Sequence, residues 1–203
     1  GLTAIGHAAT QVAVGNLDRA LAGGVEMMSR VPFLGDNASY YTDASLPKRT
    51  RFIPVVLAAD RLAEKEGVSR EQLDAVALVS QQRAGAAEAD PALTASRVPL
   101  GGLSRDECAR PQSTLQSLAA MAPSFAALAA QYADALDGPI DHRHTIGHAP
   151  PICDGAGLAL IGGAPAASDK PRARILGYAE SGGDPHASLL AGFGAMAKVL
   201  ERT

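Results

Sequence analysis

The sequence predicts an α/β fold, and three observations indicate it. Apolar residues recur at helical spacing from Leu2 to Val14, where Gly15 supplies a stop. A short uncharged run bounded by glycine, residues 20–25, follows the helix and suits a strand buried on both faces. A second such run occurs at residues 158–161. Because helices alternating with buried strands are typical of α/β proteins, we expect the two runs to belong to one sheet.

The stretch between these runs, residues 31–144, is expected to be a mostly helical insertion. Residues 32–51 are rich in turn-forming residues and predict a loop. A helix beginning near Val55 should end at Gly67, and Ser69 with Gln72 forms a capping-box pattern that opens another helix. A similar pattern at residues 113–116 opens a helix that Pro123 should interrupt.

After residue 161 the pattern predicts one further strand at residues 173–179 and a last helix at residues 188–201. The net charge of −3 over 203 residues gives no basic footprint for nucleic acid, and no apolar run is long enough to span a bilayer. No signal peptide is visible, and with only 2 cysteines we expect no disulfide framework and a cytoplasmic protein.

The segment at residues 22–32, Ala-Gly-Gly-Val-Glu-Met-Met-Ser-Arg-Val-Pro, resembles the thiolase family, in which a Gly-Gly-x-Glu-x-Met-Ser segment follows a core strand. The resemblance continues in order over nearly the whole chain. The further matching motifs are Ser69-Arg70-x-x-x-Asp74, Thr114-Leu115, Pro123-x-Phe125, Thr145-x-Gly147 and Asp154-Gly155-Ala156.

This resemblance implies a thiolase-like layered mixed sheet with helices, in which the strands at residues 20–25 and 158–161 lie side by side or one strand apart, plus a mostly helical loop-domain insertion. Residues 1–30 and 145–169 would form part of the N-terminal core, residues 31–144 the loop domain, and residues 170–203 the start of the C-terminal domain. It also implies an acyltransferase of fatty acid metabolism that acts on acyl-CoA thioesters, by 3-oxoacyl-CoA thiolysis or by acetyl-CoA condensation. Coenzyme A would be a co-substrate with no permanently bound cofactor, and a homodimer or homotetramer is expected, with residues 20–28 of two chains in contact.

No catalytic residue is assigned within these 203 residues. The resemblance places the family's nucleophilic cysteine just before Gly1 and its Asn-Glu-Ala-Phe, Gly-His-Pro and Cys-x-Gly segments after Thr203, so we expect the chain alone to be inactive. Cys108 and Cys153 have no neighbouring base that would lower the pKa of the thiol. We interpret Cys153 as a buried structural thiol.

The resemblance assigns contact with coenzyme A to Gly147, His148 and Ala149. Three positions depart from the family pattern in this region. Ala122 replaces a common Lys or Arg, His148 replaces an asparagine, and Pro150 replaces a serine. These departures predict an altered preference for acyl-CoA, a different pose of the coenzyme, or a relaxed binding function.

The histidines of the pattern His-x-His-x-x-x-His, at His142, His144 and His148, could offer ligands to zinc on an extended backbone. A loop with solvated histidines is the simpler interpretation, and we predict no metal site. Two alternatives to a thiolase activity therefore stay open. One is a non-catalytic thiolase-like protein that binds CoA esters or a partner subunit, and the other is a small metal-dependent hydrolase built on the histidines.

Overall fold

The computed structural model describes residues 1–43, 45–163, 170–171 and 173–203. The chain divides into two compact units. The first consists of Gly1–Ala38, Ile152–Gly183 and Leu190–Thr203, and the second of Ser39–Pro151 and Asp184–Leu189. No helix in the described part of the chain is long and apolar enough to cross a membrane.

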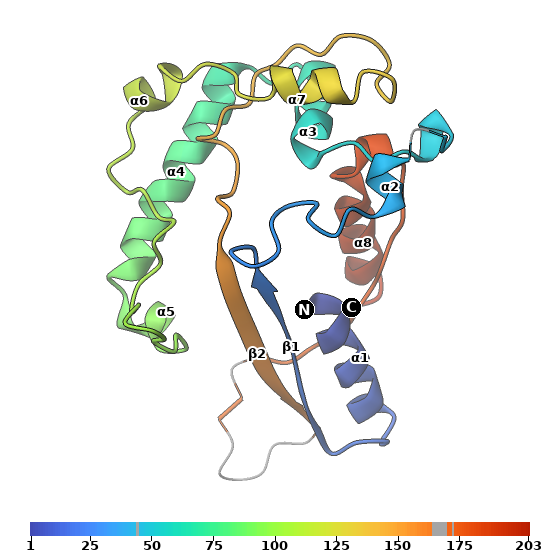
Figure 1. Cartoon of the computed structure of the whole chain (residues 1–203). Helices are drawn as coiled ribbons and strands as arrows, with labels where there is room; N and C mark the ends of the chain where they lie inside the picture. Colours follow the sequence, from blue (N-terminus) through green and yellow to red (C-terminus); the bar gives the residue numbers. More distant parts are fainter. Residues whose placement is uncertain (44, 164–169, 172) are drawn as a thin grey trace. The chain divides into compact units, whose positions relative to one another are not determined.

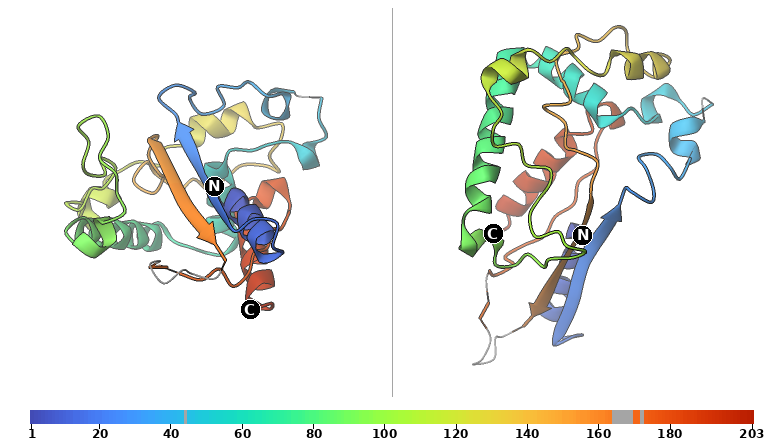
Figure 2. Two further views of the ribbon diagram at one scale, coloured as in Figure 1. Left: turned by 90° about the horizontal axis from the view of Figure 1, so that it is seen from below. Right: turned by 60° about the vertical axis from the view of Figure 1, so that its left-hand side comes forward.

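The first unit is built on a pair of antiparallel strands, β1 (Arg19–Met27) and β2 (Asp154–Gly162), with Leu21 opposite Leu160. Helix α1 (Leu2–Ala13) ends before Gly15, whose φ of +78° turns the chain back toward β1. Helix α1 lies along one face of the strand pair (Figures 1 and 2). The expected adjacency of the two strand runs is confirmed. Within the described residues, however, the sheet is two-stranded and antiparallel rather than mixed.

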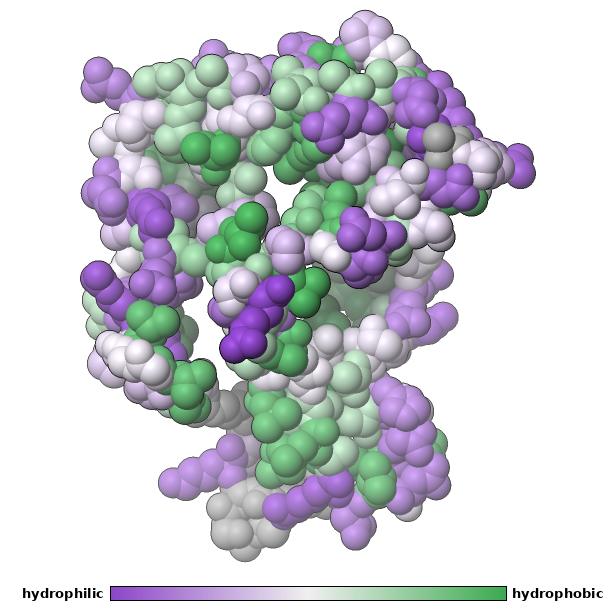
Figure 3. Space-filling model, viewed as in Figure 1, coloured by the Kyte–Doolittle hydropathy of each residue, from purple (hydrophilic) through white to green (hydrophobic). Residues whose placement is uncertain are grey.

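The two faces of this strand pair differ in burial. Ala22 on β1 and Ala8 on α1 are buried where the helix covers the sheet. On the opposite face, large apolar side chains of both strands are 62% to 73% exposed: Leu21, Val25, Leu158 and Leu160. Figure 3 shows apolar surface gathered over this part of the chain. The prediction that these strands are buried on both faces is therefore wrong for this chain, because α1 covers only one face.

The segment expected to be a strand, residues 173–179, belongs to no helix or strand. Its contacts are made with α1 instead, since the ring of Tyr178 lies so close to Gly6 that a Cβ there would be 2.5 Å from a ring carbon. Glu180 accepts hydrogen bonds from Tyr178 and from Thr3, the latter at 3.2 Å. The last helix, α8 (Leu190–Leu200), is confirmed, and Lys198 Nζ donates to the backbone oxygen of Glu180.

The second unit is mainly helical. Its elements are α2 (Ser39–Thr42), η1 (Lys48–Thr50), α3 (Val55–Lys65), α4 (Arg70–Glu88), α5 (Pro91–Thr94), α6 (Leu115–Ala119), α7 (Ala126–Gln131) and η2 (Pro185–Ala187). The loop predicted at residues 32–51 thus contains two short helical turns. A small apolar core joins α3 to the segment after α7 through Ile53, Leu57, Ala58, Ala135 and Leu136.

Local sequence explains how α3 and α4 are connected. Gly67 adopts a φ of +65° after α3, a conformation that favours glycine. The Ser69 side chain accepts from the backbone N–H of Gln72, and the Gln72 side chain accepts from the backbone N–H of Ser69 at 2.7 Å. This confirms the predicted helix end and capping box, which place Arg70 and Asp74 on the first turns of α4.

Candidate functional site

The segment 141–149, which carries the histidines, is tied to α3 by a single buried carboxylate. Asp60 is fully buried, and its two oxygens accept hydrogen bonds from the Nδ1 atoms of His142 (2.8 Å) and His144 (2.6 Å). The backbone N–H groups of Arg143 and His144 donate to the same carboxylate at 3.0 and 2.8 Å. These bonds fill the acceptor capacity that a buried carboxylate must satisfy.

Burial by itself would raise the pKa of Asp60, but the hydrogen bonds from His144, His142 and Arg143 outweigh it and hold the pKa below its usual value. The carboxylate is therefore ionised at neutral pH. The His142 and His144 side chains are each only 16% exposed, so the prediction of solvated histidines is wrong. Their Nδ1 atoms are committed to Asp60, and among the described residues no group of acidic, histidine or cysteine side chains is arranged to hold a metal ion.

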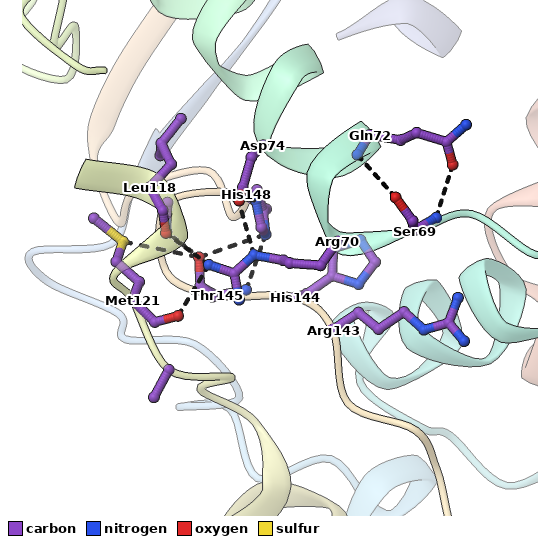
Figure 4. Close-up of polar contacts among 12 residues, drawn as sticks. Ser69, Arg70, Gln72, Asp74, Leu118, Met121, Arg143, His144, Thr145 and His148 are labelled. Carbon is purple, nitrogen blue, oxygen red and sulfur yellow. Dashed lines mark hydrogen bonds and ion pairs between the residues drawn. The ribbon is translucent and has the colours of Figure 1, made fainter. Parts of the chain in front are cut away.

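A second set of contacts ties the same segment to α4 (Figure 4). His148 Nε2 lies 2.7 Å from Asp74 Oδ1, and Arg70 Nε donates to that oxygen at 2.9 Å. The Nη2 atom of Arg70 also donates to the backbone oxygens of Leu118 (2.6 Å) and Met121 (2.9 Å). Arg70 thus joins the carboxylate to the chain that follows α6, because one guanidinium can serve several acceptors.

The protonation states follow from burial and charge. The side chains of His148 and Asp74 are 5% and 4% exposed. Burial lowers the pKa of His148 below its usual value, and the hydrogen bond to Asp74 opposes this shift without cancelling it. Burial would raise the pKa of Asp74, but hydrogen bonds from Arg70 and His148 bring it below its usual value. At neutral pH the pair is a neutral histidine beside a carboxylate.

The turn at residues 145–149, which the His148 side chain closes, is stabilised by hydrogen bonds between its own residues. The backbone N–H of Thr145 donates to His148 Nδ1 at 3.0 Å, and the backbone N–H of Gly147 donates to Thr145 Oγ1 at 3.1 Å. Asp74, His148 and Thr145 have the residue types of a catalytic triad, with Thr145 Oγ1 3.4 Å from Nδ1. Thr145 is nevertheless fully buried, and Nδ1 already accepts from a backbone N–H, so this threonine has no path to a substrate.

The residues assigned to coenzyme A lie in this turn. Gly147 and Ala149 are half-buried, the side chain of His148 is 5% exposed, and a Cβ on Gly147 would lie 2.9 Å from Leu118 Cδ2 and 3.1 Å from Met121 Sδ. Both nitrogens of His148 are engaged within the chain, so neither ring nitrogen is free to bind a ligand. Pro150, which departs from the family pattern, is exposed beside the turn.

The two cysteines are not part of this arrangement. Cys153 is exposed immediately before β2, so its interpretation as a buried thiol is wrong. Cys108 is half-buried. Sequence reasoning also did not assign roles to Asp60, Asp74 and Arg70. The spacing of Arg70 and Asp74 was the available signal, because residues four apart share a helix face.

Comparison with known proteins identifies the family. Residues 1–162 match the family described as the thiolase N-terminal domain. The beta-ketoadipyl-CoA thiolase of Pseudomonas putida is 34% identical over 100% of this chain and 54% of its own length. The human mitochondrial 3-ketoacyl-CoA thiolase is 31% identical over 91% of this chain and 49% of its own length. The chain therefore belongs to the thiolase family, and it spans about half the length of the curated relatives it matches.

Comparison with solved structures supports the same family. The crystal structure of human mitochondrial 3-ketoacyl-CoA thiolase in complex with CoA is similar with a TM-score of 0.78 and 28% identity, over 100% of this chain and 53% of that chain. The dimeric peroxisomal thiolase of Saccharomyces cerevisiae gives a TM-score of 0.60 and 27% identity, over 80% of this chain and 40% of that chain. The predicted family and its α/β fold are confirmed.

Proposed function

We propose that this chain is part of a thiolase-type acyltransferase that acts on acyl-CoA thioesters, by thiolysis of 3-oxoacyl-CoA or by the reverse condensation. The observation that carries the proposal is the match of residues 1–162 to the thiolase N-terminal domain. The likeness over 100% of this chain to a thiolase in complex with CoA supports it. Coenzyme A acts as a co-substrate, with no permanently bound cofactor.

The domain assignment belongs to the same proposal. Residues 1–30 and 145–169 form part of the N-terminal core, residues 31–144 the loop domain, and residues 170–203 the start of the C-terminal domain; residues 44, 164–169 and 172 lie outside the described part. The helical content of Ser39–Pro151 supports the loop-domain assignment. Cytoplasmic location is part of the proposal too, although relatives include a mitochondrial enzyme.

Contact with coenzyme A is proposed at Gly147, His148 and Ala149. The supporting observation is that Asp74 of α4, which is paired with Arg70, binds His148 of this turn, and that the backbone N–H of Thr145 donates to His148 within the turn. A braced turn presents its backbone groups in one arrangement, so less conformational entropy is lost when a ligand binds.

The proposed homodimer or homotetramer is formed through residues 20–28. Leu21 and Val25 are 68% and 70% exposed, and unpaired strand edges with apolar side chains are costly in water. A dimeric yeast thiolase with a similar structure supports self-association as well.

A second candidate function is binding of CoA esters without turnover. The departures at Ala122, His148 and Pro150, together with a buried Asp-His-Thr arrangement that reaches no substrate, favour it.

One experiment separates the two candidates. The protein encoded by the open reading frame that contains these residues is assayed for thiolysis of acetoacetyl-CoA by free CoA, and its affinity for CoA is measured by calorimetry. Binding with turnover supports the thiolase proposal, and binding without turnover supports the second candidate. Absence of both would contradict the two proposals together.

A further inference from the structure

The turn at residues 145–149 is closed by a histidine that can do so only in its neutral form. The backbone N–H of Thr145 donates to Nδ1 of His148 at 3.0 Å, so Nδ1 carries a lone pair and no proton. The ring proton is therefore on Nε2, which faces Asp74 Oδ1 at 2.7 Å. One ring thus joins the turn to α4 by accepting on one side and donating on the other.

Protonation would break this arrangement. In the imidazolium form both ring nitrogens are donors, so an Nδ1–H would point at the N–H of Thr145 and the hydrogen bond between them would be lost. The ring has little room to turn away, because the His148 and Asp74 side chains are 5% and 4% exposed. Thr145 Oγ1 lies 3.4 Å from Nδ1 but already accepts from the backbone N–H of Gly147, so we expect the turn to change its conformation to accommodate the charged ring.

The groups that surround the His148 ring control its protonation state. Helix α4 contributes Asp74 and Arg70, which are paired with each other at 2.9 Å. Its own segment contributes His144, whose ring is perpendicular at 5.7 Å and is bound in turn to Asp60 of α3. The chain after α6 contributes the uncharged Met121. With Arg70 offsetting Asp74, burial favours the neutral ring and lowers the pKa of His148.

We propose that His148 is a positioning residue and a pH-sensitive latch: its neutral ring holds the turn at residues 145–149 in the arrangement that meets coenzyme A, and protonation releases the turn. This inference rests on the proposed function for its ligand. It goes beyond that function by making binding of the coenzyme depend on a single proton at a position where the family pattern has an asparagine.

Two amide variants separate the roles of the two ring nitrogens. In His148→Asn the amide oxygen takes the place of Nδ1 and accepts from Thr145, but the side chain does not titrate. In His148→Gln the amide nitrogen takes the place of Nε2 beside Asp74, and no acceptor remains for the N–H of Thr145. His142→Asn is the matched control, because His142 is also bound to a buried aspartate but lies outside the turn.

Affinity for CoA is measured by calorimetry in steps from about pH 7.5 to about pH 4.5, because the pKa of His148 lies below the ordinary histidine value. One linked proton changes an affinity by at most about tenfold per pH unit. We expect the Kd of the native chain and of His142→Asn to rise as the pH falls through the lowered pKa of His148, by a larger factor than the Kd of His148→Asn and by at most about tenfold per pH unit. Phosphate groups of CoA titrate near pH 6, so the His148→Asn variant provides the baseline for the ligand's own titration.

Equal pH dependence of the Kd for CoA in the native chain and in His148→Asn would contradict the proposal that His148 acts as a latch. His148→Gln should bind CoA weakly at every pH tested. If this variant does not fold, the comparison of the native chain with His148→Asn is sufficient to test the latch. The latch also has a readout without CoA, since the amide resonance of Thr145 should shift with the titration of His148 in NMR spectra. A chain that shows this shift but binds no CoA at any pH would overturn the proposed ligand and leave the proton-linked turn intact, whereas an unshifted resonance would overturn the latch itself.

Discussion

His148 Nε2 lies 2.7 Å from Oδ1 of Asp74, a residue 74 positions earlier in the chain. This contact joins the turn before β2 to the second turn of α4, and Arg70 braces it from the same helix face at 2.9 Å. A parallel contact joins His144 to Asp60 on α3. Two buried carboxylates therefore determine where the turn proposed to bind coenzyme A is held.

Asp60→Asn should destabilise the second unit strongly. The amide nitrogen replaces an acceptor oxygen, so at least one of the donors from His142, Arg143 and His144 is left unpaired in a buried site. Each buried unsatisfied group costs about 1–3 kcal/mol, so we expect a loss of about 3 kcal/mol in the free energy of unfolding, measured in urea.

Asp137→Asn is the control for this prediction. Asp137 forms an ion pair with Lys48 at 2.7 Å, but the two side chains are 71% and 46% exposed. Solvent screens such an exposed pair, so the change in stability should be small. Equal effects of the two variants would contradict the structural role given to Asp60.

The free energy of unfolding should decrease in two stages as the pH is lowered. The folded-state pKa of His148 is lowered, so the unfolded chain takes up a proton first and stability decreases as the pH falls below about 6.5. Asp60 and Asp74 also have lowered pKa values, and their contribution is present above about pH 4 and lost as the pH falls through their folded-state values.

Urea unfolding at about pH 7.5, 5.5, 4 and 3 tests these stages, because these pH values bracket the ordinary pKa values of histidine and aspartate. His148→Asn should remove the first decline and keep the second. A chain more stable at pH 5.5 than at 7.5 would show that the sign of the His148 shift is wrong.

Leu21→Asp should disrupt self-association. Leu21 is 68% exposed on the strand proposed to lie at the interface, and a buried unpaired charge there would be costly. Ser39→Asp is the control, because Ser39 is exposed and lies outside residues 20–28. Sedimentation should show dissociation or aggregation only for Leu21→Asp, and an unchanged folded dimer would rule out this interface.

The 203 residues alone should not catalyse thiolysis of acetoacetyl-CoA, since they contain no assigned nucleophile or base. Cys153→Ala should therefore change nothing in the assay. Measurable turnover that this substitution abolishes would make the exposed Cys153 the nucleophile and would replace our account of the chemistry.

Local sequence signals predicted local structure well. The φ of +65° at Gly67 and the Ser69–Gln72 capping box appear where the residues indicated them, because both depend on neighbours within one turn. Burial was predicted less well. Leu21 and Leu160 were predicted to be core residues. The burial of a strand face depends on packing against distant parts of the chain, and here α1 covers one face of the strand pair while the other face stays exposed.

The candidate turn also shows that local features are predictable from the sequence, whereas contacts with distant residues are not. Its position follows from the motif residues Thr145 and Gly147, whereas its support by Asp60 and Asp74 depends on contacts across more than 70 residues, which spacing does not reveal. The histidines were therefore predicted to be solvated, although the fold buries them beside carboxylates.

The most direct test of the central claim is to add CoA to the isotopically labelled chain at about pH 7.5, where His148 is neutral, and to map the amide resonances that move. We expect the amide resonances of Gly147, His148 and Ala149 to shift in a saturable way, while those of α5 stay unchanged. Saturable binding with no change at residues 147–149, or no binding at all, would contradict it.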